Sequence, residues 1–259
     1  MYNILIAAGA AAVAYALGVT VAGWWVGFIP GLLALVAVWI VLARRTGRQV
    51  EAIMKRAMEQ LQANKADEAR ATMESALPLG KWQILVSEQV HSQLGSLDYL
   101  QAVGMHVQKQ TTAAKAKFAA ARAHLEKSWS RDWRARAVLA AIHHREGRPD
   151  EAAAVLEKAS GAGKGETLFW GLYVYVLNEA KKRDEALKVV GRGLEANKDS
   201  KALLALQEAL SNKKRPDMKV LGESWYQFFP EDIPREQLMQ MQGVQQKMRS
   251  VKTFPQPRR

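Results

Sequence analysis

The sequence contains no cysteine, and its first 43 residues contain no Asp, Glu, Lys or Arg. The absence of cysteine excludes a disulfide framework, a zinc finger and a cysteine nucleophile, but it does not fix the compartment. All 37 basic and 25 acidic side chains lie between Arg44 and Arg259, so the formal net charge of +12 belongs to that part of the chain. This charged part is long enough for one sizeable domain or a short repeat array.

The uncharged head is apolar from Ile4 to Ala43. One helix of this length would be about 60 Å long, about twice the thickness of the hydrocarbon layer, so two membrane spans fit better. We expect the spans at Ile4–Ala22 and Phe28–Ala43, with the break at Gly23–Gly31.

Residues of the break and of the first span favour this hairpin. Trp24 and Trp25 suit the headgroup level, and Pro30 suits the first turn of a new helix. Small residues in the first span would allow it to pack closely on the second span or on another protein; they are Ala7, Gly9, Ala11 and Gly18. The alternative is that Ala and Gly are merely common in such helices.

Two observations concern the cleavage of the apolar head and its orientation in the membrane. Ala14-Tyr15-Ala16 offers a signal-peptide cleavage site, but the preceding residues carry no basic side chain and a second apolar run follows at once, so we favour an uncleaved anchor. Arg44, Arg45 and Arg48 follow the second run, with no acidic residue before Glu51. The positive-inside rule therefore predicts a cytoplasmic body.

The body has a helical pattern without strand-like alternation, and three short polar breaks are each followed by an Asp-Glu-Ala triplet. Acidic residues favour a helix N-terminus, and the small Ala lets a paired helix approach closely. The triplets end at Ala69, Ala152 and Ala186, and the last two are 34 residues apart. With this period the body resembles the tetratricopeptide repeat family.

The resemblance covers roughly Val50 to Leu210 and implies about four repeats of two helices. The second helices of the four units would carry small-large-small series that begin at Ala69, Ala114, Ala152 and Ala186. The intervals before and after Ala114 depart from the family period, which suggests an elongated helix or a loop near Gly104–Thr112. The segment from Lys201 to Leu210 would be a capping helix.

The tail follows Pro216 and places four aromatic residues in five positions: Trp225, Tyr226, Phe228 and Phe229. They could dock a partner or the membrane interface, or they could fold back and cover the last repeat. We expect a weakly amphipathic helix from Arg235 to about Arg249 and disorder from Val251 to Arg259. The predicted architecture is all-α, with a transmembrane hairpin at 1–47, repeats and cap at 48–215, and the tail at 216–259.

No catalytic motif stands out. The segment Ser160–Thr167 lacks the glycine spacing of a phosphate-binding loop and follows no strand, so it is better explained as a turn between repeats. His143 and His144 are adjacent and point about 100° apart on a helix, so packing explains them better than metal binding. We therefore expect no enzyme activity, no cofactor and no metal site.

The region 107–136 has a surplus of positive charge, with Trp129 and Trp133 among its basic residues. The hypotheses are a solvated helix face, contact with anionic lipid, and nucleic-acid binding, of which the last has no motif to support it.

The architecture is similar to that of bacterial inner-membrane repeat proteins that assist envelope assembly or regulation. Our leading hypothesis is therefore a scaffold or adaptor at a bacterial inner membrane that binds a partner protein in the groove of its repeats. The resemblance implies that first-helix residues line this groove, namely Ser92, Tyr99, Arg134, His144, Tyr175 and Asn178. These residues depart from the carboxylate-clamp pattern. The alternatives are a structural subunit whose spans make the main contacts, and a component of an enzyme whose chemistry a partner supplies.

Overall fold

The computed structural model describes residues 1–234, which form helices and no strand. The predicted helix from Arg235 and the predicted disorder from Val251 lie outside the described residues. The α-helices are α1 (Tyr2–Ala22), α2 (Trp24–Gln62), α3 (Ala66–Glu74), α4 (Val86–Val107), α5 (Thr111–Lys127), α6 (Trp133–Arg145), α7 (Pro149–Ala159), α8 (Thr167–Glu179), α9 (Arg183–Ala196) and α10 (Lys201–Ser211). The 3-10 helices are η1 (Leu77–Lys81), η2 (Met218–Gln227) and η3 (Pro230–Asp232).

The all-α prediction is confirmed, and the chain divides into two compact units. Of the described residues, the first unit contains 1–106 and 110–142, and the second contains 107–109 and 143–234. The described part of the predicted tail, residues 216–234, therefore belongs to the same unit as helices α7 to α10. Each unit is described by itself.

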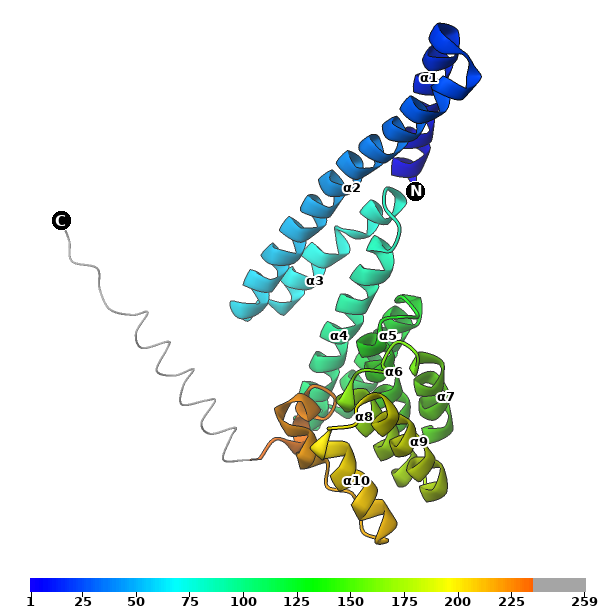
Figure 1. The fold of residues 1–259 in the computed structure, drawn as a ribbon. Helices are drawn as coiled ribbons and strands as arrows, with labels where there is room; N and C mark the ends of the chain where they lie inside the picture. The colour runs from blue at the N-terminus through cyan, green and yellow to red at the C-terminus, as the bar shows by residue number, and fades with distance from the viewer. Residues whose placement is uncertain (235–259) are drawn as a thin grey trace, which may run out of the picture. The chain divides into compact units, whose positions relative to one another are not determined.

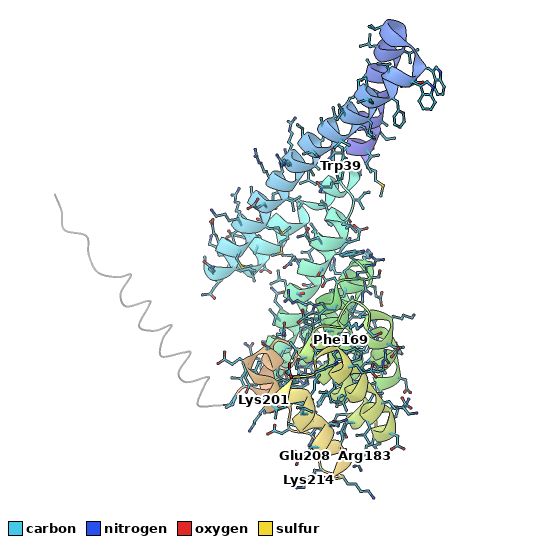
Figure 2. All side chains as sticks on the ribbon, in the orientation of Figure 1. Trp39, Phe169, Arg183, Lys201, Glu208 and Lys214 are labelled. Atoms are coloured by element: carbon cyan, nitrogen blue, oxygen red, sulfur yellow. The ribbon has the colours of Figure 1, made fainter. Side chains whose placement is uncertain are left out.

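In the first unit, α1 and the first half of α2 form an antiparallel hairpin (Figure 1). Both helices are long and apolar enough to cross a membrane. The turn is Gly23 alone, with a φ of 88° that favours glycine. The break is thus shorter than predicted, and Pro30 lies inside α2 and not in its first turn. Large side chains such as Trp39 project outward from the hairpin (Figure 2).

Small residues allow the two helices of the hairpin to approach closely, as predicted. Ala7 is fully buried, and a Cβ added at Gly18 would lie 2.5 Å from the Cα of Gly27. A Cβ at Gly27 would lie 2.6 Å from the carbonyl oxygen of Tyr15. Gly9, in contrast, has no heavy atom within 4 Å of such a Cβ, so it does not lie at this contact.

Helix α2 continues without a break from the hairpin into the helical body. Its residues Val50 and Ala57 are buried in a core with residues of α3, of η1 and its flanks, and of α4; the other buried members are Ala69, Met73, Ala76, Val86, Val90, Leu94 and Leu97. The predicted boundary at residue 47 therefore falls inside one helix. The second half of α2 and helix α3 lie where the sequence predicts the two helices of the first repeat.

Helices α4 and α5 form the next pair along the chain. In α4 and α5 the close contact is made at Gly95, where an added Cβ would lie 2.6 Å from Cγ of Leu125. Helix α4 runs as far as Val107, so an elongated helix explains the irregular interval before Ala114. In the second unit α7 packs on α8, α8 on α9 and α9 on α10, and Phe169 of α8 is fully buried (Figure 2).

Polar contacts tie the helices of the second unit together. Glu157 of α7 accepts a hydrogen bond of 3.0 Å from the Tyr173 hydroxyl of α8, and it pairs with Arg192 of α9 at 2.8 Å. The predicted capping helix is α10, and the Ser200 hydroxyl accepts from the Leu203 N–H at its start. Ser160–Thr167 connects α7 to α8, as predicted for a turn between repeats.

The hairpin contact generates a prediction with a matched control. Replacing Gly27 by Leu should separate the two helices because its side chain would meet the backbone of α1, whereas Gly9→Leu should have little effect. The readout is oxidative crosslinking of an Asn3→Cys/Thr46→Cys pair, because Asn Nδ2 and Thr Oγ1 at these positions lie 3.1 Å apart. Equal crosslinking in both backgrounds would contradict the close contact.

Candidate protein-binding groove

The candidate site lies in the second unit, on one face of α8 and on the last turn of α6. Gly171 and Tyr175 of α8 are four residues apart and therefore share a face of the helix. Because Gly171 has no side chain, Leu221 of η2 can lie against the backbone of α8; an added Cβ would be 2.6 Å from Cδ1 of Leu221. The site is thus open enough to receive another chain segment.

In this structure the segment that fills the site is η2–η3 of the same chain. The ring of Trp225 lies 5.1 Å from that of Tyr175, and Phe229 lies 5.1 Å from Tyr175 and 6.0 Å from His144. Trp225 and Phe229 stack on each other at 4.7 Å. Trp225, Phe228 and Phe229 are all buried, with at most 4% of their surface exposed. Edge-to-face and stacked ring pairs of this kind add to the stabilisation that burial of the rings provides.

Polar groups hold the two ends of this aromatic cluster. The Arg145 guanidinium donates to Glu231 at 2.7 Å and to the carbonyl of Phe228 at 3.2 Å, and it lies 5.0 Å from the centre of the Phe229 ring. The indole N–H of Trp225 donates to Asp232 at 2.9 Å. The site therefore contacts two aromatic rings and an acidic side chain that follows them in the sequence.

The segment itself borders a hollow that Tyr175 of α8 also lines. This hollow of about 410 Å³ lies beside Tyr175 and Trp225, and Arg215, Asp217 and Tyr226 also line it. The bend at Gly222, where φ is 69°, turns the segment so that Leu221 and Trp225 both reach α8.

Burial changes the titration of the two groove side chains. Burial lowers the pKa of His144, against the opposing effect of the Glu179 carboxylate, and its Nδ1 has no hydrogen-bond partner within the described residues. Burial also raises the pKa of Tyr175 to about 12, with further contributions from Glu179 and Asp232. Both side chains are therefore neutral near pH 7.

The structure brings together only part of the groove expected from the sequence. His144 and Tyr175 lie in the site, and Asn178 is half-buried near the end of α8. Arg134 belongs to the other unit and is exposed, with its guanidinium 5.2 Å from the ring of Trp133.

Ser92 and Tyr99 require a correction because both are buried. The Ser92 hydroxyl donates to Asp132 at 2.6 Å, and the Tyr99 ring packs 5.9 Å from Phe118. They therefore do not line an open groove.

Sequence reasoning also missed Gly171 and Arg145, which help to make the site. Arg145 directly follows His143 and His144, which the sequence explained by packing, so no separate role was predicted for it. Gly171 has no side chain that could have indicated a contact. The acidic residues that follow the aromatic cluster in the sequence could have indicated an ion pair with a cationic side chain, which is the contact that Arg145 makes.

Two cations of the basic region 107–136 are directed into the first unit. Lys117 pairs with the fully buried Asp98 at 3.3 Å, and Asp98 also pairs with Arg70. The Arg136 guanidinium donates to the Ser128 hydroxyl at 3.0 Å. Lys117 and Arg136 therefore make polar contacts within the first unit. The lipid-contact hypothesis rests on the remaining cations of the region.

Comparisons with known proteins bear on the second unit above all. Residues 143–210 match the tetratricopeptide repeat family, which confirms the resemblance seen in the sequence. The crystal structure of the P58(IPK) TPR domain is similar to 88% of this chain at 20% identity, with a TM-score of 0.36, and the match spans 64% of that chain. A comparison with curated proteins gives no match.

The half-buried His144 predicts a pH dependence of the groove contact. Because its pKa is lowered where the segment packs on it, the released state takes up a proton more readily once the pH falls below about 6.5. The packing free energy is therefore fully present above that pH and decreases as the pH falls toward the lowered pKa. Hydrogen exchange of residues 225–229, corrected for intrinsic rates, should be faster at pH 5.5 than at pH 7.5.

A His144→Phe variant should lose this dependence, because it keeps a ring in place and cannot titrate. His106→Gln is the matched control, since His106 is exposed and lies in the other unit. An unchanged pH dependence in His144→Phe would show that another group controls the contact.

Proposed function

We propose that this chain, which carries tetratricopeptide repeats at residues 143–210, is a membrane-anchored adaptor that binds a partner protein in its groove. Repeats of this kind are protein–protein interaction scaffolds, because stacked helix pairs create an extended binding surface. The adaptor would hold its partner at the bilayer and so assemble or regulate a membrane-associated complex. Confinement to the membrane raises the effective concentration of the two partners without requiring tight intrinsic binding.

The observation that carries this proposal is the aromatic segment in the groove. The groove residues Tyr175, His144 and Arg145 contact Trp225, Phe229 and Glu231 by ring packing, by cation–π contact and by an ion pair. A segment of another protein with two aromatic residues followed by an acidic residue could make the same contacts. The chain's own segment would then act as a competing occupant that a partner must displace.

Two features support the membrane anchor. The hairpin of α1 and α2 is apolar and exposes large side chains such as Leu5, Leu33 and Trp39. Arg44 and Arg45 are also exposed, just beyond the apolar part of α2, while Trp24 and Trp25 lie exposed at the turn of the hairpin. By the positive-inside rule we place the repeats in the cytoplasm, and from the resemblance we place the anchor in a bacterial inner membrane.

Binding, and not catalysis, is the activity we propose. The groove offers aromatic rings, a guanidinium and a small residue, which are groups typical of recognition. Within residues 1–234 we find no group of three His, Cys, Asp or Glu side chains arranged to hold a metal ion. The partner that we propose is a protein segment whose side chains these recognition groups can contact.

The alternative, a structural subunit of a membrane complex, is favoured by one observation. The hairpin carries an apolar groove of about 290 Å³, lined by small and large side chains that include Ala11, Gly31 and Leu35. Small residues of this kind can receive another transmembrane helix. The two functions differ in which part holds the partner, so exchange of residues 4–43 for an unrelated hairpin separates them.

The groove proposal is tested with a labelled peptide of residues 216–234 added to the full chain. In a Trp225→Ala/Phe229→Ala variant the peptide should bind, because each truncation weakens the internal occupant by about 3–5 kcal/mol. In the unmodified chain, peptide binding should be at least about tenfold weaker, because the tethered segment competes at an effective concentration in the millimolar range. Fluorescence anisotropy measures both affinities.

A Val220→Ala/Glu223→Ala variant is the matched control, because both residues are exposed in the same segment. It should behave like the unmodified chain. A peptide that lacks its two aromatic side chains should not bind to any variant. If the aromatic-free peptide binds the opened groove equally well, or if neither peptide binds it, the groove is not a receptor for aromatic segments.

A further inference from the structure

A short loop of the first unit exposes three large apolar side chains next to the anchor. The loop contains residues 82–85, between η1 and α4, and the exposed fractions of Trp82, Ile84 and Leu85 are 42%, 46% and 38%. Leu85 has a φ of 70°, a left-handed conformation that residues with a side chain rarely adopt. Such a conformation persists only where the surrounding structure imposes it.

The loop is attached to the start of α1. The backbone N–H of Asn3, which has no partner inside its own helix, donates to the carbonyl of Trp82 at 3.2 Å. The ring of Tyr2 lies 5.2 Å from that of Trp82 in an edge-to-face arrangement. The loop therefore lies at the level where the first apolar helix begins.

A contact between α1 and α2 shows which part of α2 lies beside the start of α1. The Asn3 side chain donates to the Thr46 hydroxyl at 3.1 Å, in a buried contact between the two helices. Arg44, Arg45 and Arg48 are each within two residues of Thr46, so they lie within about 3 Å of its level along the helix axis. All three are exposed, as is Lys81 immediately before the loop.

We propose that loop 82–85 inserts its apolar side chains into the headgroup layer of the bilayer and so fixes the first repeat against the membrane. This inference rests on the membrane anchor of the proposed function. Tryptophan next to tyrosine is typical of the membrane–water interface, and exposed arginines and lysine at that level attract anionic headgroups. The lipid surface is the occupant that matches both the apolar tip of the loop and the positive charge around it.

The absence of cysteine makes a direct test simple, because a single introduced cysteine can be labelled. An environment-sensitive dye is placed at Ile84→Cys, at Leu33→Cys in the hairpin, or at Met58→Cys. Met58 is 52% exposed and lies 12 residues beyond Thr46 on the same helix, which is about 18 Å further from the hairpin. The full chain is inserted into vesicles of equal parts phosphatidylcholine and phosphatidylglycerol, with nitroxide lipids labelled at the headgroup or deep in the acyl chain.

The dye at residue 84 should show a blue-shifted emission and be quenched more strongly by the headgroup nitroxide than by the deep one. The dye at residue 33 should be quenched by the deep nitroxide, and the dye at residue 58 by neither. Quenching at residue 33 but not at residue 84 would overturn the loop proposal and leave the anchor intact. A blue shift at residue 84 without quenching would also overturn it, because protein would then cover the loop. Absence of quenching at residue 33 would remove the anchor and the loop proposal together.

Discussion

The continuity of α2 connects the apolar hairpin to the repeats. A helix of 39 residues is about 58 Å long, which is far more than a membrane span requires. Its first half packs on α1 through Gly27 and Gly31, and its second half contributes Val50 and Ala57 to the core of the first repeat. Because a helix resists bending between these two packed regions, the first repeat has a defined distance and orientation relative to the hairpin.

In the second unit, as in the hairpin, a glycine allows two segments of the chain to approach closely. Gly171 leaves room on α8 for Leu221, and the aromatic cluster then covers Tyr175 and His144. A groove that holds a segment of its own chain is protected from weak or unrelated ligands, because any ligand must compete with a tethered occupant. In the proposed adaptor, this competition would set the threshold for partner binding.

The sequence was most informative where a local pattern determines the structure. The 34-residue interval from Ala152 to Ala186 predicted the two repeats that match the family, because each small residue must face its paired helix. The single-residue turn at Gly23 was not predictable, because Pro30 and two tryptophans also looked like a break. The groove positions Ser92 and Tyr99 were wrong, because both side chains are buried in the first unit. The aromatic tail left two alternatives, and only the tertiary contacts with α6 and α8 place its rings.

The central claim is that one uninterrupted helix joins the apolar hairpin to the helical body. Hydrogen exchange of residues 44–57, measured on the full chain in lipid nanodiscs, tests it most directly. A continuous helix packed at both ends predicts slow exchange across the whole stretch, with no gap between Arg44 and Val50. Fast exchange confined to residues 44–49 would reveal a flexible joint there and would contradict the account.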